Sequence, residues 1–252
     1  ILRIKELDPD MINPSTKNMN KPEQGGSKIV VIGDIHGHDS WKKLIELNPD
    51  ATEFVFIGDY FDSFSVSHTE QIYNYKEIIE WKKSTDIKVT MLIGNHDFHY
   101  MSDCGGRYGG YNAWHAPEIG ELLRETKEHL QVAYQVDKFL FTHAGVSKEW
   151  YDINFPEGGN IPEQINDLWS YDKRSFNHSG MEMYGNYDGE GPMWIRPQAL
   201  RRNPLNDTII QVVGHTNMRV IDYDDNHYFV DALPYEYMTI ENGVPVINTL
   251  VL

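Results

Sequence analysis

Residues 28–37 of this 252-residue chain read KIVVIGDIHG, and this stretch decides the fold. Ile29–Ile32 is a short run of β-branched residues, which is typical of a buried strand and too short for a helix. The run ends at Gly33, and Asp34 and His36 follow at once. A buried strand that leads through glycine into metal-binding side-chain types predicts an α/β sheet with a site at the carboxyl end of the strand.

The same arrangement recurs along the chain. Further short apolar runs occupy Phe54–Ile57, Val89–Ile93, Phe139–Phe141 and Thr208–Val213. Each run ends beside an Asp, Asn or His, and the four exits are Gly58-Asp59, Gly94-Asn95, Thr142-His143 and Gly214-His215. Because ligands of open α/β sheets bind outside the carboxyl ends of the strands, we expect these side chains to gather. Carboxylate, amide and imidazole donors together favour Mn, Fe or Zn.

The spacing between the runs indicates the fold class. Apolar residues at helical spacing lie within residues 41–48, 72–79 and 119–123. This alternation of strands and helices predicts an α/β layer with largely parallel strands. After Val220 the pattern changes to short strands, which we expect to form an antiparallel second sheet packed on the first. Pro and Gly punctuate residues 1–27, which we interpret as an N-terminal arm or linker before a domain at 28–252.

The charge and composition limit the partners. The formal net charge is −16, which argues against nonspecific binding to nucleic acids. Anionic substrates would also be repelled unless bound cations supplied a local positive field. No apolar run approaches about 18 residues, so we expect no membrane span. The lone Cys104 fits a reducing compartment, and we expect a cytoplasmic protein.

Five blocks in this order resemble the calcineurin-like metallophosphoesterases: GDIHG, GDYFD, GNHD, THAG and GHT. The likeness is closest to the phosphoprotein phosphatase branch with its bacterial and phage relatives, including symmetrical diadenosine tetraphosphatases. The resemblance implies a four-layer α/β/β/α sandwich with two mixed sheets and two transition metal ions, of which Mn is preferred over Fe or Zn. It implies one metal on Asp34, His36 and Asp59, and a second, bridged by Asp59, on Asn95, His143 and His215.

The resemblance also implies a mechanism. Two metals that share a water lower its pKa, so that the hydroxide attacks phosphorus directly and no covalent intermediate forms. The leaving alkoxide needs a proton, and His96, which follows Asn95, is the candidate acid. Asp62 lies three residues beyond Asp59 and is the candidate partner that orients this imidazole.

Some positions depart from the pattern of the phosphatase branch. Asp62 is followed by Ser63 and Phe64, where that branch has Arg-Gly, so a phosphate-binding arginine is missing there. The third block ends in Asp97 where Glu is usual. Asn217 stands where many broader family members have a second His, and this change matches the phosphatase branch.

Phosphate favours a planar guanidinium, so another arginine should replace the missing one. Arg196, in a Trp-Ile-Arg-Pro segment, is the first candidate, and Arg107 in a Gly-rich loop is the second. Asn95 is expected to contact the substrate as well as a metal.

Three functions remain open. The first is hydrolysis of a phosphomonoester on a protein, nucleotide or small molecule, and the second is hydrolysis of dinucleoside polyphosphates. The third is a metal-bound interaction module without chemistry, which the complete ligand set and the presence of His96 and Asp62 disfavour. We therefore expect an enzyme whose partner is a phosphorylated substrate.

Overall fold

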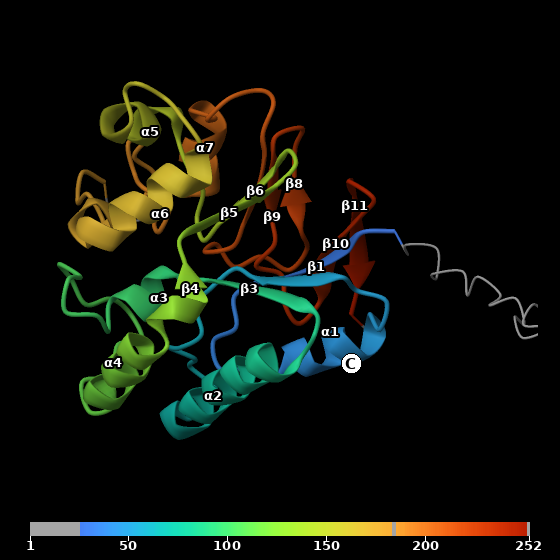
Figure 1. Ribbon diagram of the computed structural model, residues 1–252. Coiled ribbons are helices and arrows are strands. Elements are labelled where there is room, and N and C mark those ends of the chain that lie inside the picture. The colour runs from blue at the N-terminus through green and yellow to red at the C-terminus, as the bar shows by residue number, and fades with distance from the viewer. Residues whose placement is uncertain (1–25, 183–184, 251–252) are drawn as a thin grey trace, which may run out of the picture.

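A computed structural model describes residues 26–182 and 185–250 of the chain (Figure 1). Two mixed β-sheets pack face to face, and helices cover their outer faces. This arrangement confirms the predicted α/β/β/α sandwich. The arm predicted at residues 1–27 lies almost entirely outside the described residues.

The first sheet has the strand order β11-β10-β1-β2-β3-β4. Its parallel strands are β1 (Lys28–Ile32), β2 (Glu53–Phe56), β3 (Lys88–Leu92) and β4 (Leu130–Gln131). Val30 lies opposite Phe54, and Phe54 lies opposite Val89. In this register the carboxyl ends of β1, β2 and β3 finish at one edge of the sheet.

The second sheet has the order β5-β6-β7-β9-β8. Its strands are β5 (Ala133–Val136), β6 (Phe139–Thr142), β7 (Ile210–Val213), β8 (Asp222–Tyr223) and β9 (His227–Phe229). The central strands β6, β7 and β9 are parallel, and the edge strands β5 and β8 run antiparallel to their neighbours.

The prediction for the C-terminal strands is confirmed for their antiparallel pairing and is wrong for the sheet that the last two strands join. The hairpin of β10 (Glu236–Glu241) and β11 (Val244–Thr249) extends the first sheet, with β10 antiparallel to β1. The second sheet does contain β8 and β9, but β6 and β7 from earlier in the chain form the rest of its centre. The reason lies in burial: Tyr237 packs in the core on the helical side of the first sheet, whereas Met238 and Ile240 pack between the sheets. A strand buried on both faces belongs inside a sheet.

Alternate residues of the strands separate the layers. The core between the sheets is formed by β-branched and aromatic side chains from both, including Ile29, Val31, Val55, Ile57, Leu92, Phe139, Phe141 and Val212. The intervening residues of the first sheet, such as Val30 and Phe54, point the opposite way, into the core under the helices. This period of two is what a strand buried on both faces requires.

The predicted helices are confirmed. The helices that share the outer core of the first sheet are α1 (Ser40–Leu47), α2 (His68–Ser84) and α4 (Ala116–Glu125). Those on the side of the second sheet are α5 (Lys148–Asn154), α6 (Ile161–Tyr171) and α7 (Pro197–Arg202). Shorter turns are α3 (Asn95–Phe98), η2 (Lys127–His129) and η3 (Lys173–Phe176). Within the described ranges, no helix has the length and apolar character needed to cross a membrane.

Candidate metal centre

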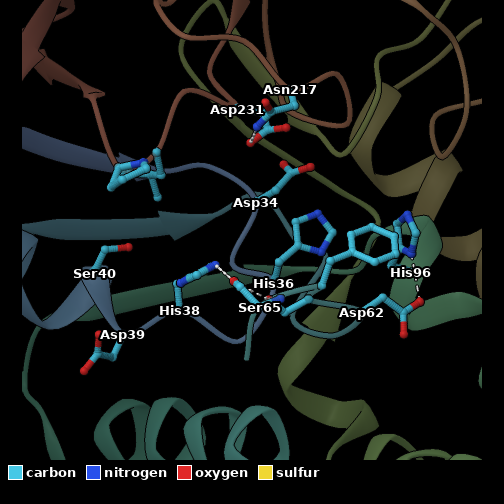
Figure 2. A pocket seen from close by; sticks show the side chains of 14 residues that line it. Asp34, His36, His38, Asp39, Ser40, Asp62, Ser65, His96, Asn217 and Asp231 are labelled. Carbon is cyan, nitrogen blue, oxygen red and sulfur yellow. Dashed lines mark hydrogen bonds and ion pairs between the residues drawn. The ribbon is translucent and has the colours of Figure 1, made fainter. Parts of the chain in front are cut away.

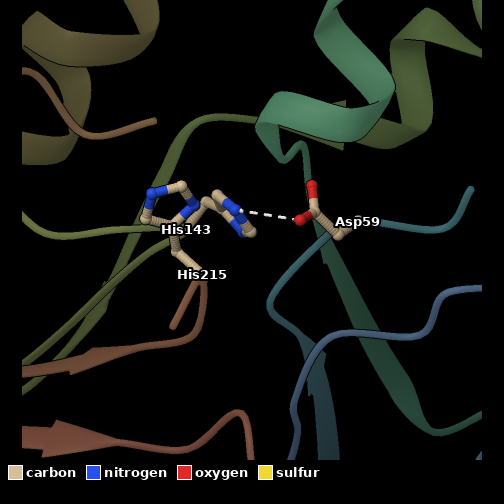
Figure 3. A group of neighbouring side chains, drawn as sticks. All are labelled: Asp59, His143 and His215. Atoms are coloured by element: carbon tan, nitrogen blue, oxygen red, sulfur yellow. Dashed lines mark ion pairs between the residues drawn. The ribbon is translucent and has the colours of Figure 1, made fainter. Parts of the chain in front are cut away.

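The six candidate metal ligands come from the carboxyl ends of strands in both sheets. Asp34 and His36 follow β1, Asp59 follows β2, and Asn95 begins α3 directly after β3; His143 and His215 follow β6 and β7. The sequence predicted that five strand ends gather these side chains, without assigning the strands to particular sheets. The structure brings together the edges of two packed sheets, and His143 and His215 approach Asp59 from the second sheet (Figure 3).

Glycines at the strand exits allow this close approach. A Cβ atom on Gly94 would lie 2.1 Å from Oδ1 of Asp59, and a Cβ atom on Gly214 would lie 2.0 Å from Oδ1 of Asp34. Both distances are far below any allowed contact. Glycine is therefore required at both positions because each carboxylate packs on the backbone of a neighbouring strand exit.

The backbone at the site is held in a rare conformation. The φ angles of His36, Asp59, Asp62 and His215 are 41°, 51°, 69° and 65°. This left-handed region is uncommon for residues other than glycine and costs on the order of 1–3 kcal/mol for each residue. Such strain persists where the surrounding structure fixes it, and it gathers at functional sites.

The donor atoms form two overlapping groups. In the first, donor atoms of Asp34, His36 and Asp59 lie within 4.8 Å of one another, and in the second the same is true of Asp59, His143 and His215. Asp59 belongs to both groups and is almost completely buried. Its Oδ2 atom lies 3.8 Å from Nε2 of His36 and 3.3 Å from Nε2 of His143. This placement suits a carboxylate that bridges two cations.

Backbone carbonyls orient the three imidazoles. Nδ1 of His36 lies 2.7 Å from the carbonyl oxygen of Phe61, and Nδ1 of His143 lies 3.0 Å from that of Ile57. For His215 the roles are reversed, since Nε2 lies 3.1 Å from a carbonyl oxygen. Each ring donates its N–H to a carbonyl, so its other nitrogen carries a lone pair, as in metal-binding histidines.

The amide of Asn95 gives the clearest indication of a cation. Its Oδ1 atom lies 2.9 Å from Nε2 of His143 and 2.8 Å from Nδ1 of His215. In each ring the proton is on the other nitrogen, which donates it to a backbone carbonyl, so the nitrogen that faces Asn95 carries a lone pair. The amide oxygen of Asn95 is also an acceptor and has no proton to give. Burial lowers the pKa of His215 well below its usual range, which keeps that ring neutral. Three lone pairs that face one another without a proton suit a shared metal ion.

The carboxylates carry more negative charge than the site can balance alone. Burial raises the pKa of Asp34 well above its usual range, and the charges of Asp231 and Asp59 add to the rise. Burial, with a contribution from Asp59, raises the pKa of Asp231 to about 6. Asp59 behaves oppositely, because His143 and other imidazoles outweigh its burial and lower its pKa. Bound cations would relieve this repulsion, so the donor set fits two metals.

Asp97 holds two of the loops in place. Its carboxylate accepts hydrogen bonds from the backbone N–H groups of Gly94 (2.9 Å), Asp59 (2.9 Å) and Tyr60 (2.7 Å). The side chain is fully buried. The residue that replaces the usual Glu of the third block therefore ties the exit of β2 to the exit of β3.

The candidate acid His96 lies beside these ligands. Its Nδ1 atom is 2.8 Å from Oδ2 of Asp62, so the ring can present Nε2 to a substrate. Burial opposes a charge on His96, but the carboxylates of Asp59 and Asp62 raise its pKa to about 9. The same Oδ2 atom also lies 2.6 Å from Nε2 of His99, and Tyr100 donates its hydroxyl to Oδ1 over 2.5 Å. The imidazole is thus protonated at neutral pH and is firmly oriented.

Two cavities meet at these residues. The first, which we call the Ser65 cavity, has a volume of about 530 Å³ (Figure 2). It is lined by Asp34, His36, His38, Asp39, Ser40, Asp62, Ser63, Phe64, Ser65, His96, Asn217, Asp231, Leu233 and Pro234. The second, the Trp194 cavity, has a volume of about 580 Å³. It is lined by His36, Asp59, Phe64, Asn95, His96, Tyr108, Gly109, His178, Trp194, Arg196, His215, Asn217 and Asp231.

The structure separates the two arginine candidates. Arg196 lines the Trp194 cavity beside the candidate ligands, and its Nη1 donates to the carbonyl oxygen of His215 and to Oγ1 of Thr216, both at 3.1 Å. Arg107 lines a different cavity, lies over the ring of Tyr111 and donates to the carbonyl of Gly106. The geometry therefore favours Arg196 for contact with a phosphate at the metal centre.

Sequence reasoning did not single out Asp231 and His99, two residues of this region. Asp231 follows β9 and lines both cavities, and Asn217 faces it at 3.5 Å (Figure 2). The signal was present, since Asp231 ends the short apolar run of β9 as Asp34 ends that of β1. His99 carries no such signal, because it lies in the turn after α3 rather than at a strand end.

Comparisons with known proteins agree with the fold and identify the family. Residues 27–238 match the family model described as calcineurin-like phosphoesterase, so this chain belongs to that family. The resemblance stated from the five sequence blocks is thereby confirmed.

Curated relatives place the chain near several kinds of phosphatase. A Saccharomyces cerevisiae serine/threonine-protein phosphatase, PP1-1, is 28% identical over 48% of this chain and 40% of its own length. A symmetrical bis(5'-nucleosyl)-tetraphosphatase of Glaesserella parasuis is 27% identical over 48% of this chain and 45% of its own. The chain therefore spans less than half of the length of these relatives.

A solved structure supports the fold alone. The cold-active protein-tyrosine phosphatase of a psychrophilic Shewanella superposes with a TM-score of 0.60 at 18% identity. The match covers 90% of this chain and 81% of that protein.

Proposed function

We propose that this protein is a dinuclear metal-dependent phosphomonoesterase. The single observation that carries the proposal is the position of Asp59, whose carboxylate belongs at once to the Asp34–His36 group and to the His143–His215 group. Membership of the calcineurin-like phosphoesterase family supports the same conclusion.

The residues divide into three roles. Asp34, His36 and Asp59 would hold one metal, and Asp59 with Asn95, His143 and His215 would hold the other. When bound, the two ions supply positive charge for the phosphate oxygens and acidify a water for attack on phosphorus. Mn is the ion we favour, with Fe or Zn as alternatives, because the donors combine carboxylate, amide and imidazole.

The chain's own residues complete the reaction. His96 donates the proton that the leaving oxygen needs, and Asp62 holds the ring so that Nε2 faces the substrate. Arg196 contacts phosphate oxygens that face away from the metals, since burying them without a partner is costly. Asn95, which opens α3, also faces the bound phosphate from the Trp194 cavity.

The charges of the cavities favour a monoester over a dinucleoside polyphosphate. Of the described residues that line the Ser65 and Trp194 cavities, Arg196 is the sole Arg or Lys. A tetraphosphate chain carries several charges that extend beyond one metal pair, and it would meet Asp39 and Asp231 along these walls. Hydrolysis of dinucleoside polyphosphates, supported by the tetraphosphatase relative, is therefore the second candidate.

A substrate panel tests the proposal. Purified chain loaded with Mn should hydrolyse para-nitrophenyl phosphate and lose this activity after chelation. Its kcat/KM should be higher for phosphomonoesters than for bis(para-nitrophenyl) phosphate or diadenosine tetraphosphate. Preference for the tetraphosphate would replace the proposal with its alternative, and inactivity toward all three would support an interaction module instead.

A further inference from the structure

Aromatic side chains form one wall of the Trp194 cavity. The ring of Trp194 lies 4.2 Å from that of Tyr108 and 5.3 Å from that of His178, measured between ring centroids. All three residues line the cavity, and we call them the aromatic wall. Trp194 also lies 5.9 Å from the ring of His215, so the wall begins directly at the candidate metal ligands.

The aromatic wall is fixed before any ligand binds. Trp194 is buried, donates its Nε1–H to the carbonyl of Phe176 at 3.1 Å, and accepts from His215 through its own carbonyl. The backbone N–H of Tyr108 donates to Nδ1 of His99 at 3.3 Å. A wall held in this way loses little conformational entropy when a flat group packs against it.

Phe64 supplies a further aromatic surface to the same cavity. It lines both the Trp194 and the Ser65 cavities, yet its side chain is 90% exposed. The loop that carries it is ordered, because Oγ of Ser63 accepts from the backbone N–H groups of Ser65 and Val66. An exposed aromatic side chain on an ordered loop at the mouth of an active site is suited to contact with a ligand.

Charge restricts what the aromatic surfaces can bind. Among the described residues that line the Trp194 cavity, Arg196 is the sole Arg or Lys. It lies beside the candidate metal ligands, where the transferred phosphate belongs. The group that enters the cavity next to that phosphate should therefore be flat, apolar and uncharged. Its ring should follow the ester oxygen directly, because the aromatic wall starts at His215. A nucleotide would place its ribose there instead of a ring.

From these observations we infer that the preferred substrates are aryl phosphomonoesters, with phosphotyrosine as the biological form of this chemistry. The inference rests on the proposed function and specifies its leaving group. Hydrolysis breaks the bond between phosphorus and the phenolic oxygen, water forms the new P–O bond, and the phenolic oxygen takes a proton. Phe64 is the residue that provides selectivity, through contact with the ring.

Kinetics of Phe64 variants test the inference in the Mn-loaded full chain. Phe64→Ala should raise the KM for O-phosphotyrosine about 10-fold, the scale of one lost aromatic contact, and leave kcat nearly unchanged. The KM for O-phosphoserine should not move, and Phe64→Tyr should retain the wild-type KM for phosphotyrosine. Trp114→Ala is the matched control, because Trp114 is 87% exposed and lines neither cavity. Both positions are exposed, so folding should be unaffected.

The outcomes separate the inference from the proposed function. Equal kcat/KM values for phosphotyrosine and phosphoserine, or a Phe64→Ala variant with unchanged KM, would overturn the aryl preference and leave the phosphomonoesterase intact. A higher kcat/KM for AMP than for phosphotyrosine would also overturn it and assign the rings to a nucleobase. Wild-type inactivity toward every monoester would overturn both.

Discussion

Asp62 and His96 form a carboxylate–imidazole pair, with Oδ2 of Asp62 2.8 Å from Nδ1 of His96. The pair lies at the meeting of the two cavities, because His96 lines both. It turns the ring so that its second nitrogen is available to a leaving group.

Replacing His96 by Ala should lower turnover in a way that depends on the leaving group. We expect kcat for alkyl phosphates to fall by about 100-fold or more, the usual scale of general acid catalysis. The loss for para-nitrophenyl phosphate should be much smaller, because para-nitrophenolate leaves without a proton. Equal losses for both substrates would remove His96 from the role of acid.

The pH dependence of kcat should report the same pair. The pKa of His96 is raised to about 9 by the carboxylates of Asp59 and Asp62 against the effect of burial. The acid form is therefore present below about pH 9 and is lost as the pH rises through that value, so kcat should fall there. In the Asp62→Asn variant the fall of kcat should occur at lower pH, closer to the ordinary pKa of histidine. If kcat of this variant falls at the same pH as that of the wild type, the assignment of His96 as the proton donor is contradicted.

Arg196 should be sensitive to a change that keeps its charge. Lysine cannot supply the planar fork of a guanidinium, so Arg196→Lys should lower kcat/KM for phosphomonoesters about 10-fold or more. Metal content should stay as in the wild type. Arg107→Lys is the matched control, because Arg107 lines a separate cavity. A loss of kcat/KM in Arg107→Lys without a loss in Arg196→Lys would show that Arg107, and not Arg196, contacts the phosphate.

The strands that precede the candidate ligands, and the residues at their carboxyl ends, could be predicted from the sequence. Each of the five strands that precede the candidate ligands lies in a short apolar run, and each exit carries a glycine and a donor within a few residues. The Ile29–Ile32 run and its exit at Asp34 are read without knowledge of the rest of the chain. The resemblance of the five blocks then linked these exits to one family.

The division of the strands between sheets could not be predicted. A strand buried on both faces reads as a continuous apolar run in either sheet, so Phe139–Phe141 gave no sign that it belongs to the second. The contact between Asp62 and His99 could not be predicted from the sequence either. It depends on how the turn after α3 packs, and no periodic pattern encodes that packing.

Gly214 should be intolerant of a single added methyl group. In Gly214→Ala the new Cβ atom would lie 2.0 Å from Oδ1 of Asp34, which must then move. Displacing a ligand in this way should weaken Mn binding about 10-fold or more, the scale for disturbed supports of metal ligands. Gly109→Ala is the control, since a Cβ atom there meets nothing within 4 Å. A calorimetric titration with Mn compares the two, and equal affinities would contradict the steric argument.

If Asp59 bridges two metal ions, elemental analysis of the Mn-loaded chain should find both of them. We expect two metal ions per chain in the wild type and a clear loss in Asp59→Asn, because this carboxylate serves both groups. Asp207→Asn, at an exposed position, should keep the wild-type ratio. A wild-type ratio of one metal ion per chain or fewer would contradict the dinuclear site.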